Sequence, residues 1–214
     1  MQLKKTPVIL ALTMLCLAAA PAFAQTALPA APTTLTSQER EAALKQFETT
    51  RDNFLKSIAG LSQKQWTFKP APDRWSVAEV AEHITISEST IFGVVQKAMA
   101  SPAAPEKREQ VKGKDEMILQ RVPDRSHKAQ APEILRPTGR WATEADLTKA
   151  FDDSRAATIE YVRTTNDDLR DHFFDHPVFG TLDGYQWLLL IATHSERHTA
   201  QIEEVKADPN FPKE

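Results

Sequence analysis

The chain has 214 residues and a formal net charge of −3, with 26 Lys and Arg side chains against 29 Asp and Glu. Acidic and basic residues are interspersed, so the sequence offers no basic patch of the kind that binds nucleic acid. Its 6 glycines are too scattered for a glycine-rich phosphate loop, and its 1 cysteine excludes a disulfide within the chain.

The N-terminal segment has the three parts of a secretory signal peptide. Lys4 and Lys5 give it a positive start, residues 8–20 form an apolar run, and residues 22–24 read Ala-Phe-Ala, a small-x-small cleavage pattern. The apolar run is too short for a membrane-spanning helix. We therefore predict that residues 1–24 are a signal peptide. The protein is then exported, periplasmic or secreted, with no stable membrane insertion after cleavage.

The cysteine of the chain, Cys16, lies inside this predicted signal peptide. Leu15 precedes it in place of a small residue, which argues against lipid attachment. Cleavage leaves a mature chain without cysteine, so thiolate metal ligands and a cysteine nucleophile are both excluded. Residues 25–35 are rich in Ala, Pro and Thr and are predicted to form a flexible tether.

The first predicted helix begins at Thr36, where Glu39 three residues later completes a capping box. Gly60 is a typical C-terminal cap and ends the helix. The connector that follows contains Pro70 and Pro72, which exclude a long helix there.

The second predicted helix begins at Ser76, with Glu79 as its capping-box partner, and ends near Ser101. His83 shares a face with the apolar residues of this helix, so its imidazole is expected to point into the core. Ser87 lies one turn further along the same face and is a candidate to line the same cavity. The apolar face consists of Val77, Val80, Ile84, Ile91, Val94, Val95 and Ala98.

A long connection with several prolines, residues 102–141, follows the second helix. One short helix is predicted within it, at residues 116–120. A connection of this length can cross a whole bundle, so the second and third helices are predicted to run parallel.

The third predicted helix spans residues 143–165, and the fourth begins at Asp183, with Gln186 in the reciprocal capping position. The linker between them is rich in Phe and is expected to be a loop that covers one end of the bundle. Strand signals are weak throughout the chain. We predict an all-α fold, a four-helix bundle with a long crossover between helices two and three, over residues 36–207, with residues 208–214 as a C-terminal tail.

The inward face of the fourth helix carries His194 and His198. Residues four apart on a helix lie one turn above each other, so both imidazoles can reach a single ion. Together with His83 from a facing helix they would form a three-ligand site that leaves coordination positions open. Imidazole suits zinc, nickel and iron far better than magnesium or calcium. The sequence therefore predicts a divalent transition metal (zinc, nickel or iron) bound by His83, His194 and His198.

The alternative is that these three histidines are hydrogen-bonded core residues without a metal. His172 and His176 are also four apart, but Pro177 places them in a predicted loop, where this spacing defines no common face. His127 lies in the polar crossover and is not a candidate ligand.

Charged residues next to the ligands are predicted to lie outside the site. Glu82 and Glu196 point about 100° away from their ligand neighbours on a helix. We expect them to be solvated or, at most, to orient an imidazole. Arg197 is expected on the outer surface or in a salt bridge between helices.

Two segments carry a family resemblance. Residues 66–84 (WTFKPAPDRWSVAEVAEHI) resemble the first conserved block of the DinB/YfiT-like superfamily, and residues 194–202 (HSERHTAQI) resemble its last-helix motif. The similarity covers about residues 36–207. It implies a four-helix bundle with a long crossover and a metal bound by the three histidines named above.

The resemblance also implies a class of reaction. Characterised members of the superfamily include transferases and isomerases that use low-molecular-weight thiols, with zinc or nickel-type ions. It therefore favours an enzyme, a transferase rather than a hydrolase, that activates water or a thiol at the open metal positions and acts on a small-molecule substrate. Most relatives are cytoplasmic, whereas this chain is expected to be exported. The alternative function is a metal- or ligand-binding bundle without catalysis, and the exposed face of a bundle could support a homodimer.

Overall fold

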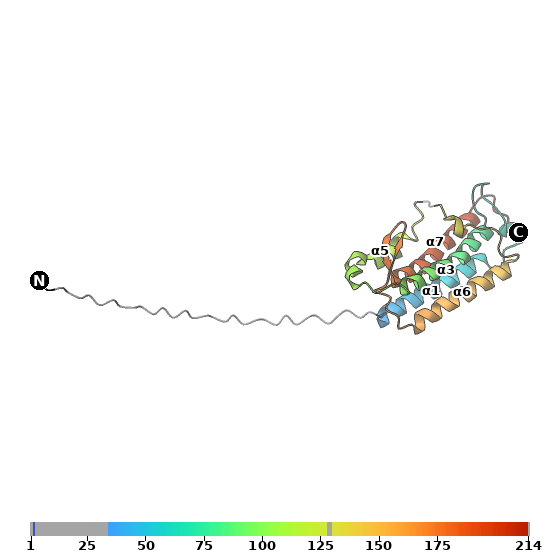
Figure 1. The fold of residues 1–214 in the computed structure, drawn as a ribbon. Coiled ribbons are helices and arrows are strands. Elements are labelled where there is room, and N and C mark those ends of the chain that lie inside the picture. The colour runs from blue at the N-terminus through green and yellow to red at the C-terminus, as the bar shows by residue number, and fades with distance from the viewer. Residues whose placement is uncertain (1, 3–33, 128–129, 214) are drawn as a thin grey trace. The chain divides into compact units, whose positions relative to one another are not determined.

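The structure, a computed structural model, describes residue 2 and residues 34–127 and 130–213 (Figure 1). Four helices of 21 to 23 residues form the body of this described part. They are α1 (Ser37–Ile58), α3 (Val77–Met99), α6 (Glu144–Thr164) and α7 (Gly184–Lys206). The predicted all-α four-helix bundle is confirmed, and each of its helices begins within one residue of the predicted start.

Shorter elements occupy the connections between these helices. They are α2 (Gln63–Trp66), the 3₁₀ turns η1 (Pro105–Lys107) and η2 (Glu133–Leu135), α4 (Arg108–Val111) and α5 (Lys114–Arg121). The short helix predicted in the crossover corresponds to α5. The crossover between α3 and α6 is therefore built from several short turns rather than from one extended stretch.

The predicted signal peptide, residues 1–24, and most of the predicted tether lie outside the described residues and stay predictions. Among the residues that the structure does describe, no helix is both long enough and apolar enough to span a membrane.

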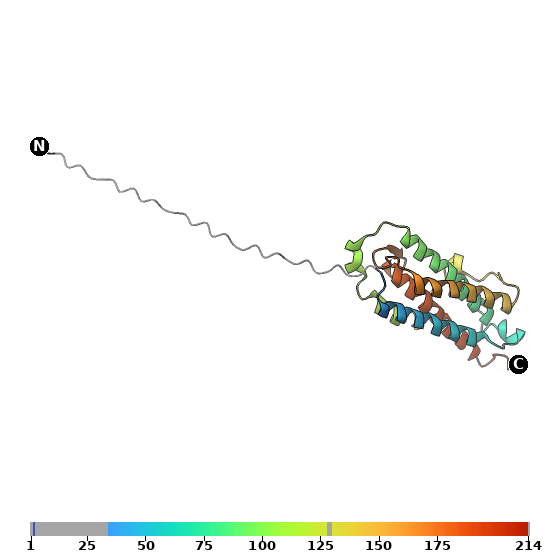
Figure 2. The ribbon, with the colours of Figure 1, turned by 90° about the horizontal axis from the view of Figure 1, so that it is seen from below.

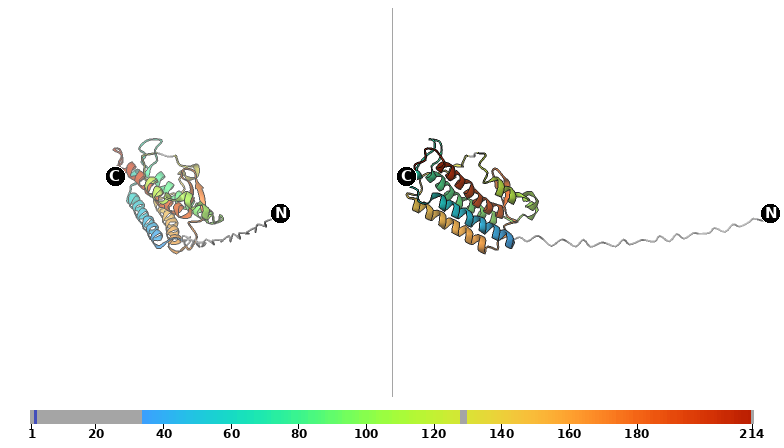
Figure 3. Two further views of the ribbon diagram at one scale, coloured as in Figure 1. Left: turned by 90° about the vertical axis from the view of Figure 1, so that its left-hand side faces the viewer. Right: turned by 180° about the vertical axis from the view of Figure 1, so that it is seen from behind.

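The long helices run in two parallel pairs. Figure 1 shows α1 and α7 running in one direction and α3 and α6 in the other, and Figures 2 and 3 show the four helices side by side along their lengths. Both α1 and α3 pack against α6 and α7. The crossover thus returns the chain to the end of the bundle where α3 began, which confirms the predicted parallel arrangement of the second and third long helices.

Side-chain caps explain why the helices begin where they do. At each start the capping side chain accepts a hydrogen bond from the backbone N–H three residues later, and three of the four caps are reciprocal boxes. A cap of this kind stabilises a helix by about 1 kcal/mol. The reciprocal pairs are Thr36 with Glu39, Ser76 with Glu79, and Asp183 with Gln186.

A hairpin lies where the sequence predicted an aromatic loop. Strand β1 (Phe173–His176) pairs antiparallel with β2 (Gly180–Asp183). The Nδ1 atom of His176 accepts hydrogen bonds from the backbone N–H groups of Val178 (3.0 Å) and Phe179 (3.2 Å), which closes the turn. The prediction of a loop was wrong because strands of four residues show too little alternation to be detected.

A buried polar layer divides the core into two apolar clusters. One cluster includes Phe47, Ile91, Ile159 and Ile191. The other includes Phe54, Ile84, Phe151 and Ile202. On each long helix, the member of the polar layer lies between the two: Thr50, Glu88, Arg155 and Ser195.

Arg155 and Glu88 form the centre of this layer as a fully buried ion pair. The guanidinium contacts both carboxylate oxygens, at 2.8 and 2.6 Å. It also donates to the hydroxyl groups of Ser195 (2.9 Å) and Thr50 (2.7 Å) and to the backbone carbonyl of Phe47 (2.8 Å). A buried charge pair is tolerated when its remaining hydrogen bonds are satisfied, as here. The layer therefore ties all four long helices together at one level of the bundle.

Candidate metal centre

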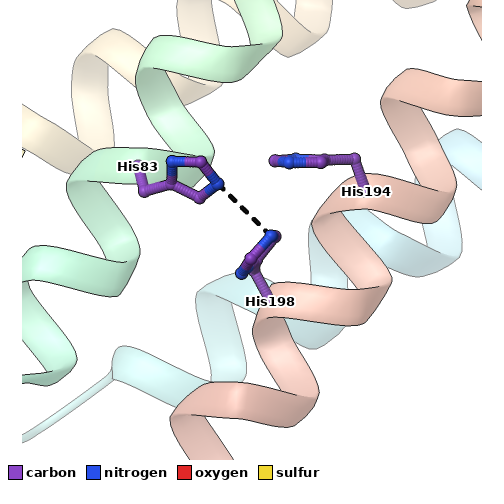
Figure 4. Close-up of side chains that lie close together, drawn as sticks. All are labelled: His83, His194 and His198. Carbon is purple, nitrogen blue, oxygen red and sulfur yellow. Dashed lines mark hydrogen bonds between the residues drawn. The ribbon is translucent and has the colours of Figure 1, made fainter. Parts of the chain in front are cut away.

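The side chains of His83, His194 and His198 converge beside this polar layer (Figure 4). His83 comes from α3 and the other two from α7, the helix that packs against it. One ring nitrogen from each histidine lies within 4.8 Å of the other two. Among the described residues, this is the one group of three or more His, Cys, Asp or Glu side chains placed to hold a metal ion.

The spacing of these nitrogens fits a single ion. Two nitrogens bound tetrahedrally to zinc at about 2.0–2.1 Å are about 3.3 Å apart. The Nε2 atoms of His83 and His198 are 3.2 Å apart. The ring centroid of His194 lies 4.9 Å from that of His83 and 4.4 Å from that of His198. All three imidazoles therefore surround one point, with one nitrogen of each within 4.8 Å of the others.

Hydrogen bonds on the far side of two rings fix which nitrogen carries the proton. The Nδ1 of His83 faces the backbone carbonyl of Leu135 at 2.8 Å, and the Nδ1 of His198 faces Oε1 of Gln201 at 2.8 Å. The same side-chain atom of Gln201 accepts a hydrogen bond from Arg125, so it is the amide oxygen and not the amide nitrogen. Both Nδ1 atoms must therefore donate, and both Nε2 atoms carry lone pairs.

Two lone pairs that face each other at 3.2 Å repel unless a cation lies between them. The contact between His83 and His198 marked in Figure 4 is thus an arrangement suited to a shared ion. An imidazole whose second nitrogen donates to a carbonyl is the usual form of a metal-binding histidine. In His194, Nδ1 is buried and has no hydrogen-bond partner among the described residues, so a neighbouring donor does not block this ring either.

Burial keeps the three imidazoles neutral. It lowers the pKa of His83, and it lowers the pKa of His198 to about 3, with further lowering by the His83 ring and by Arg125 and Arg197. The pKa of His194 lies well below its ordinary value, again mainly because of burial. Neutral imidazole is the form that binds metal, so all three rings are ready to coordinate at neutral pH.

These shifts predict how the stability of the chelator-treated protein depends on pH. In the unfolded chain each histidine has a pKa of about 6.5, so below this pH the unfolded state binds more protons than the folded state. The free energy of unfolding is therefore highest above pH ~6.5, where the histidines are neutral in both states. It decreases as the pH falls toward the pKa values of the folded state. Urea unfolding at pH 7.5 and 5.5 measures this loss. His198→Asn should show a smaller loss, and an equal loss in both proteins would contradict the assignment.

A family model described as the DinB superfamily matches residues 46–202, most of the chain. The chain belongs to the DinB superfamily. The uncharacterized protein YuaE of Bacillus subtilis (strain 168) is 26% identical over 149 residues, which cover 70% of this chain and 88% of YuaE. The family resemblance inferred from the sequence is thereby confirmed.

A solved structure supports the fold of this DinB superfamily member. YfiT from Bacillus subtilis superimposes with a TM-score of 0.50 at 14% identity, over 84% of this chain and 92% of YfiT. YfiT is described as a probable metal-dependent hydrolase with an unusual four-helix bundle topology. At this level of identity the likeness concerns the fold alone.

Glu82 lies elsewhere than the sequence predicted. Its side chain is buried, and its carboxylate accepts hydrogen bonds from three consecutive backbone N–H groups, those of Thr138 (2.8 Å), Gly139 (2.9 Å) and Arg140 (3.1 Å). The expectation of a solvated Glu82 was wrong because its partners lie more than fifty residues away, in the crossover. In this DinB superfamily bundle, Glu82, the residue next to the candidate ligand His83, thus binds the backbone of the crossover.

Arg197, between the two histidines of α7, holds another part of the crossover. Its guanidinium donates to the backbone carbonyls of Val122 (3.2 Å), Asp124 and His127 (2.6 Å). Arg197 is partly buried at the surface of α7, and these hydrogen bonds join it to backbone carbonyls of the crossover rather than to a carboxylate on another helix. Ser87 is buried, and its hydroxyl donates to the carbonyl of His83 (2.7 Å) in the preceding turn, while its place in the wall of the site stays a prediction.

The remaining candidates stay outside the triad. Glu196 is exposed and accepts a hydrogen bond from Gln46 at 2.8 Å, as expected for a solvated residue. His172 and His176 belong to the hairpin region rather than to the candidate site. The sequence did not single out Trp75, whose ring centroid lies 5.0 Å from that of His83, so that this indole forms one side of the site.

Proposed function

We propose that this chain is an exported metalloenzyme that binds one divalent transition metal through His83, His194 and His198 and hydrolyses a small-molecule substrate. The observation that carries the proposal is the pair of Nε2 lone pairs 3.2 Å apart, each fixed by a hydrogen bond at the opposite nitrogen. Such a pair favours a cation at a defined point.

The donor set suits a hydrolytic centre. Three neutral imidazoles leave the charge of a divalent ion uncompensated and leave at least one coordination position open. Bound there, the ion would supply Lewis-acid chemistry, since it lowers the pKa of a water in the open position and polarises an electrophilic oxygen. The family resemblance favoured a transferase over a hydrolase; we propose hydrolysis instead, because YfiT, a protein of the same fold, is described as a probable metal-dependent hydrolase.

The protein's own residues would hold and shield this chemistry. Leu135 and Gln201 fix the tautomers of two ligands, and Trp75 supplies an apolar wall beside His83. Because the three imidazoles carry no charge, the ion would keep its full positive charge, which favours an electron-rich or anionic group on the substrate.

Activity of the metal-loaded protein tests the proposal. The protein is treated with chelator, reloaded separately with zinc, nickel or ferrous iron, and assayed against a panel of esters, amides and phosphoesters, and against electrophiles with added thiols. We expect turnover of a water-dependent substrate with at least one ion and loss of turnover in His194→Ala. Turnover only with added thiols would indicate a transferase, and stoichiometric metal without any turnover would indicate a binding protein.

Export rests on the predicted signal peptide, residues 1–24. N-terminal sequencing of the protein recovered from the periplasm of an expression host should start at Gln25. Retention of the leader in cytoplasmic protein would contradict export and would leave the metal proposal untouched.

A further inference from the structure

Residues 131–140 of the crossover lie against the candidate site, and α3 holds them there at two neighbouring points. His83 contacts the carbonyl of Leu135 through Nδ1 at 2.8 Å. The carboxylate of Glu82, the preceding residue, accepts hydrogen bonds from the backbone N–H groups of residues 138–140. Glu82 therefore holds the loop that carries the Leu135 carbonyl, the group that orients the His83 ring.

The Glu82 contact has the geometry of an anion site built from backbone. Gly139 has a φ of +77°, in the left-handed region, and this conformation turns successive N–H groups toward one side. Concave arrangements of successive N–H groups bind anions, and a carboxylate fills this one. Hydrogen bonds to a charged acceptor are roughly twice as strong as neutral ones. A single side chain thus fixes the backbone conformation of the loop.

Hydrogen bonds within residues 131–140 connect the part of the loop that Glu82 binds to Leu135. The backbone N–H of Leu135 donates to the carbonyl of Pro132 at 2.9 Å, and the side chain of Arg140 donates to the carbonyl of Ile134 at 3.4 Å. Arg136 closes the segment by donating to the carbonyl of Ala131 at 3.3 Å. The segment that carries the Leu135 carbonyl is therefore bonded to itself and, through Glu82, to α3.

We propose that Glu82 is a positioning residue of the metal centre: by binding the N–H groups of residues 138–140 it holds the Leu135 carbonyl against Nδ1 of His83. The lone pair of His83 Nε2 then faces the other two histidines. This inference rests on the proposed metal site and adds a residue that contacts neither the ion nor the substrate. Loss of such an orienting partner weakens metal binding by about 10- to 100-fold.

Three variants test the proposal. Glu82→Gln keeps the shape of the side chain but offers one acceptor oxygen in place of two. Gly139→Ala leaves Glu82 intact and strains only the loop, because nothing lies within 4 Å of the added Cβ. Glu196→Gln is the matched control, since it removes an exposed acid that lies two residues from His194 and accepts its hydrogen bond from Gln46 of α1.

Two readouts are taken for each variant. The zinc dissociation constant is measured by competition with a chromophoric chelator. We expect it to rise by about 10- to 100-fold in Glu82→Gln and in Gly139→Ala and to stay at the wild-type value in Glu196→Gln. The imidazole ¹⁵N signals of the metal-free protein report the tautomer of His83, and we expect Nδ1–H in wild type and a mixture with Nε2–H in Glu82→Gln and Gly139→Ala.

Wild-type zinc affinity and an unchanged His83 tautomer in Glu82→Gln would overturn the proposal. If Glu82→Gln does not fold, Gly139→Ala decides by the same two readouts. Failure of the wild-type protein to bind zinc, nickel and ferrous iron would instead refute the proposed function, and the His83 tautomer would still decide whether Glu82 acts on the ring.

Discussion

His194→Ala is expected to abolish stoichiometric metal binding. The side chain supplies one of three imidazoles, and the two that remain, His83 and His198, come from different helices. Loss of a direct ligand should cost more than the roughly 10- to 100-fold loss of affinity typical of an orienting partner. Elemental analysis after loading with zinc and dialysis against metal-free buffer measures the change, with one equivalent expected in wild type and close to none in the variant.

The matched control for this prediction is His172→Ala. His172 and His176 have the same four-residue spacing as the α7 pair but lie in the hairpin region and are not part of the triad. The Nδ1 atom of His172 has no hydrogen-bond partner among the described residues, so truncation breaks no contact at that atom. The control should keep its full metal content. A His194→Ala protein that retains metal at wild-type affinity would refute the ligand assignment.

Arg155→Met is expected to destabilise the fold by about 3–5 kcal/mol, because removal of one partner leaves the other charge buried and unpaired. Glu88 would keep only the hydroxyl of Ser195, at 2.7 Å, as a donor. Urea unfolding of the chelator-treated protein measures the loss without a contribution from metal binding. The same substitution should weaken metal binding by far less than His194→Ala, since it changes none of the ligands.

Two further variants define the origin of this loss. Lys149→Met removes a cation from the same helix whose partner, Asp153, is exposed, and it should change stability little. Arg155→Met combined with Glu88→Leu removes both buried charges, and it should recover a large part of the loss. Equal stabilities for Arg155→Met and Lys149→Met would contradict the role assigned to the buried pair.

Local signals explain why so much of the fold could be predicted. The helix starts follow from caps such as Thr36 and Ser76, whose partners lie three residues away. The inward positions of His83, His194 and His198 follow from the 3.6-residue period of two apolar faces. The crossover length predicted the parallel course of α3 and α6.

Contacts between distant residues could not be predicted in the same way. The partners of Glu82 and Arg197 are backbone groups in the crossover, which no side-chain pattern marks. The buried pair left a local signal that the prediction did not use. Glu88 lies between Ile84 and Ile91 on the apolar face of α3, where a lone charge implies a buried partner.

X-ray absorption spectroscopy of the zinc-loaded protein shows directly whether the three histidines hold the ion. We expect a first shell of three imidazole nitrogens at about 2.0–2.1 Å and one further oxygen in the wild-type protein, and no such shell in His194→Ala, which should not retain zinc. A shell made of oxygens, or one that His194→Ala leaves unchanged, would show that the three histidines do not hold the ion.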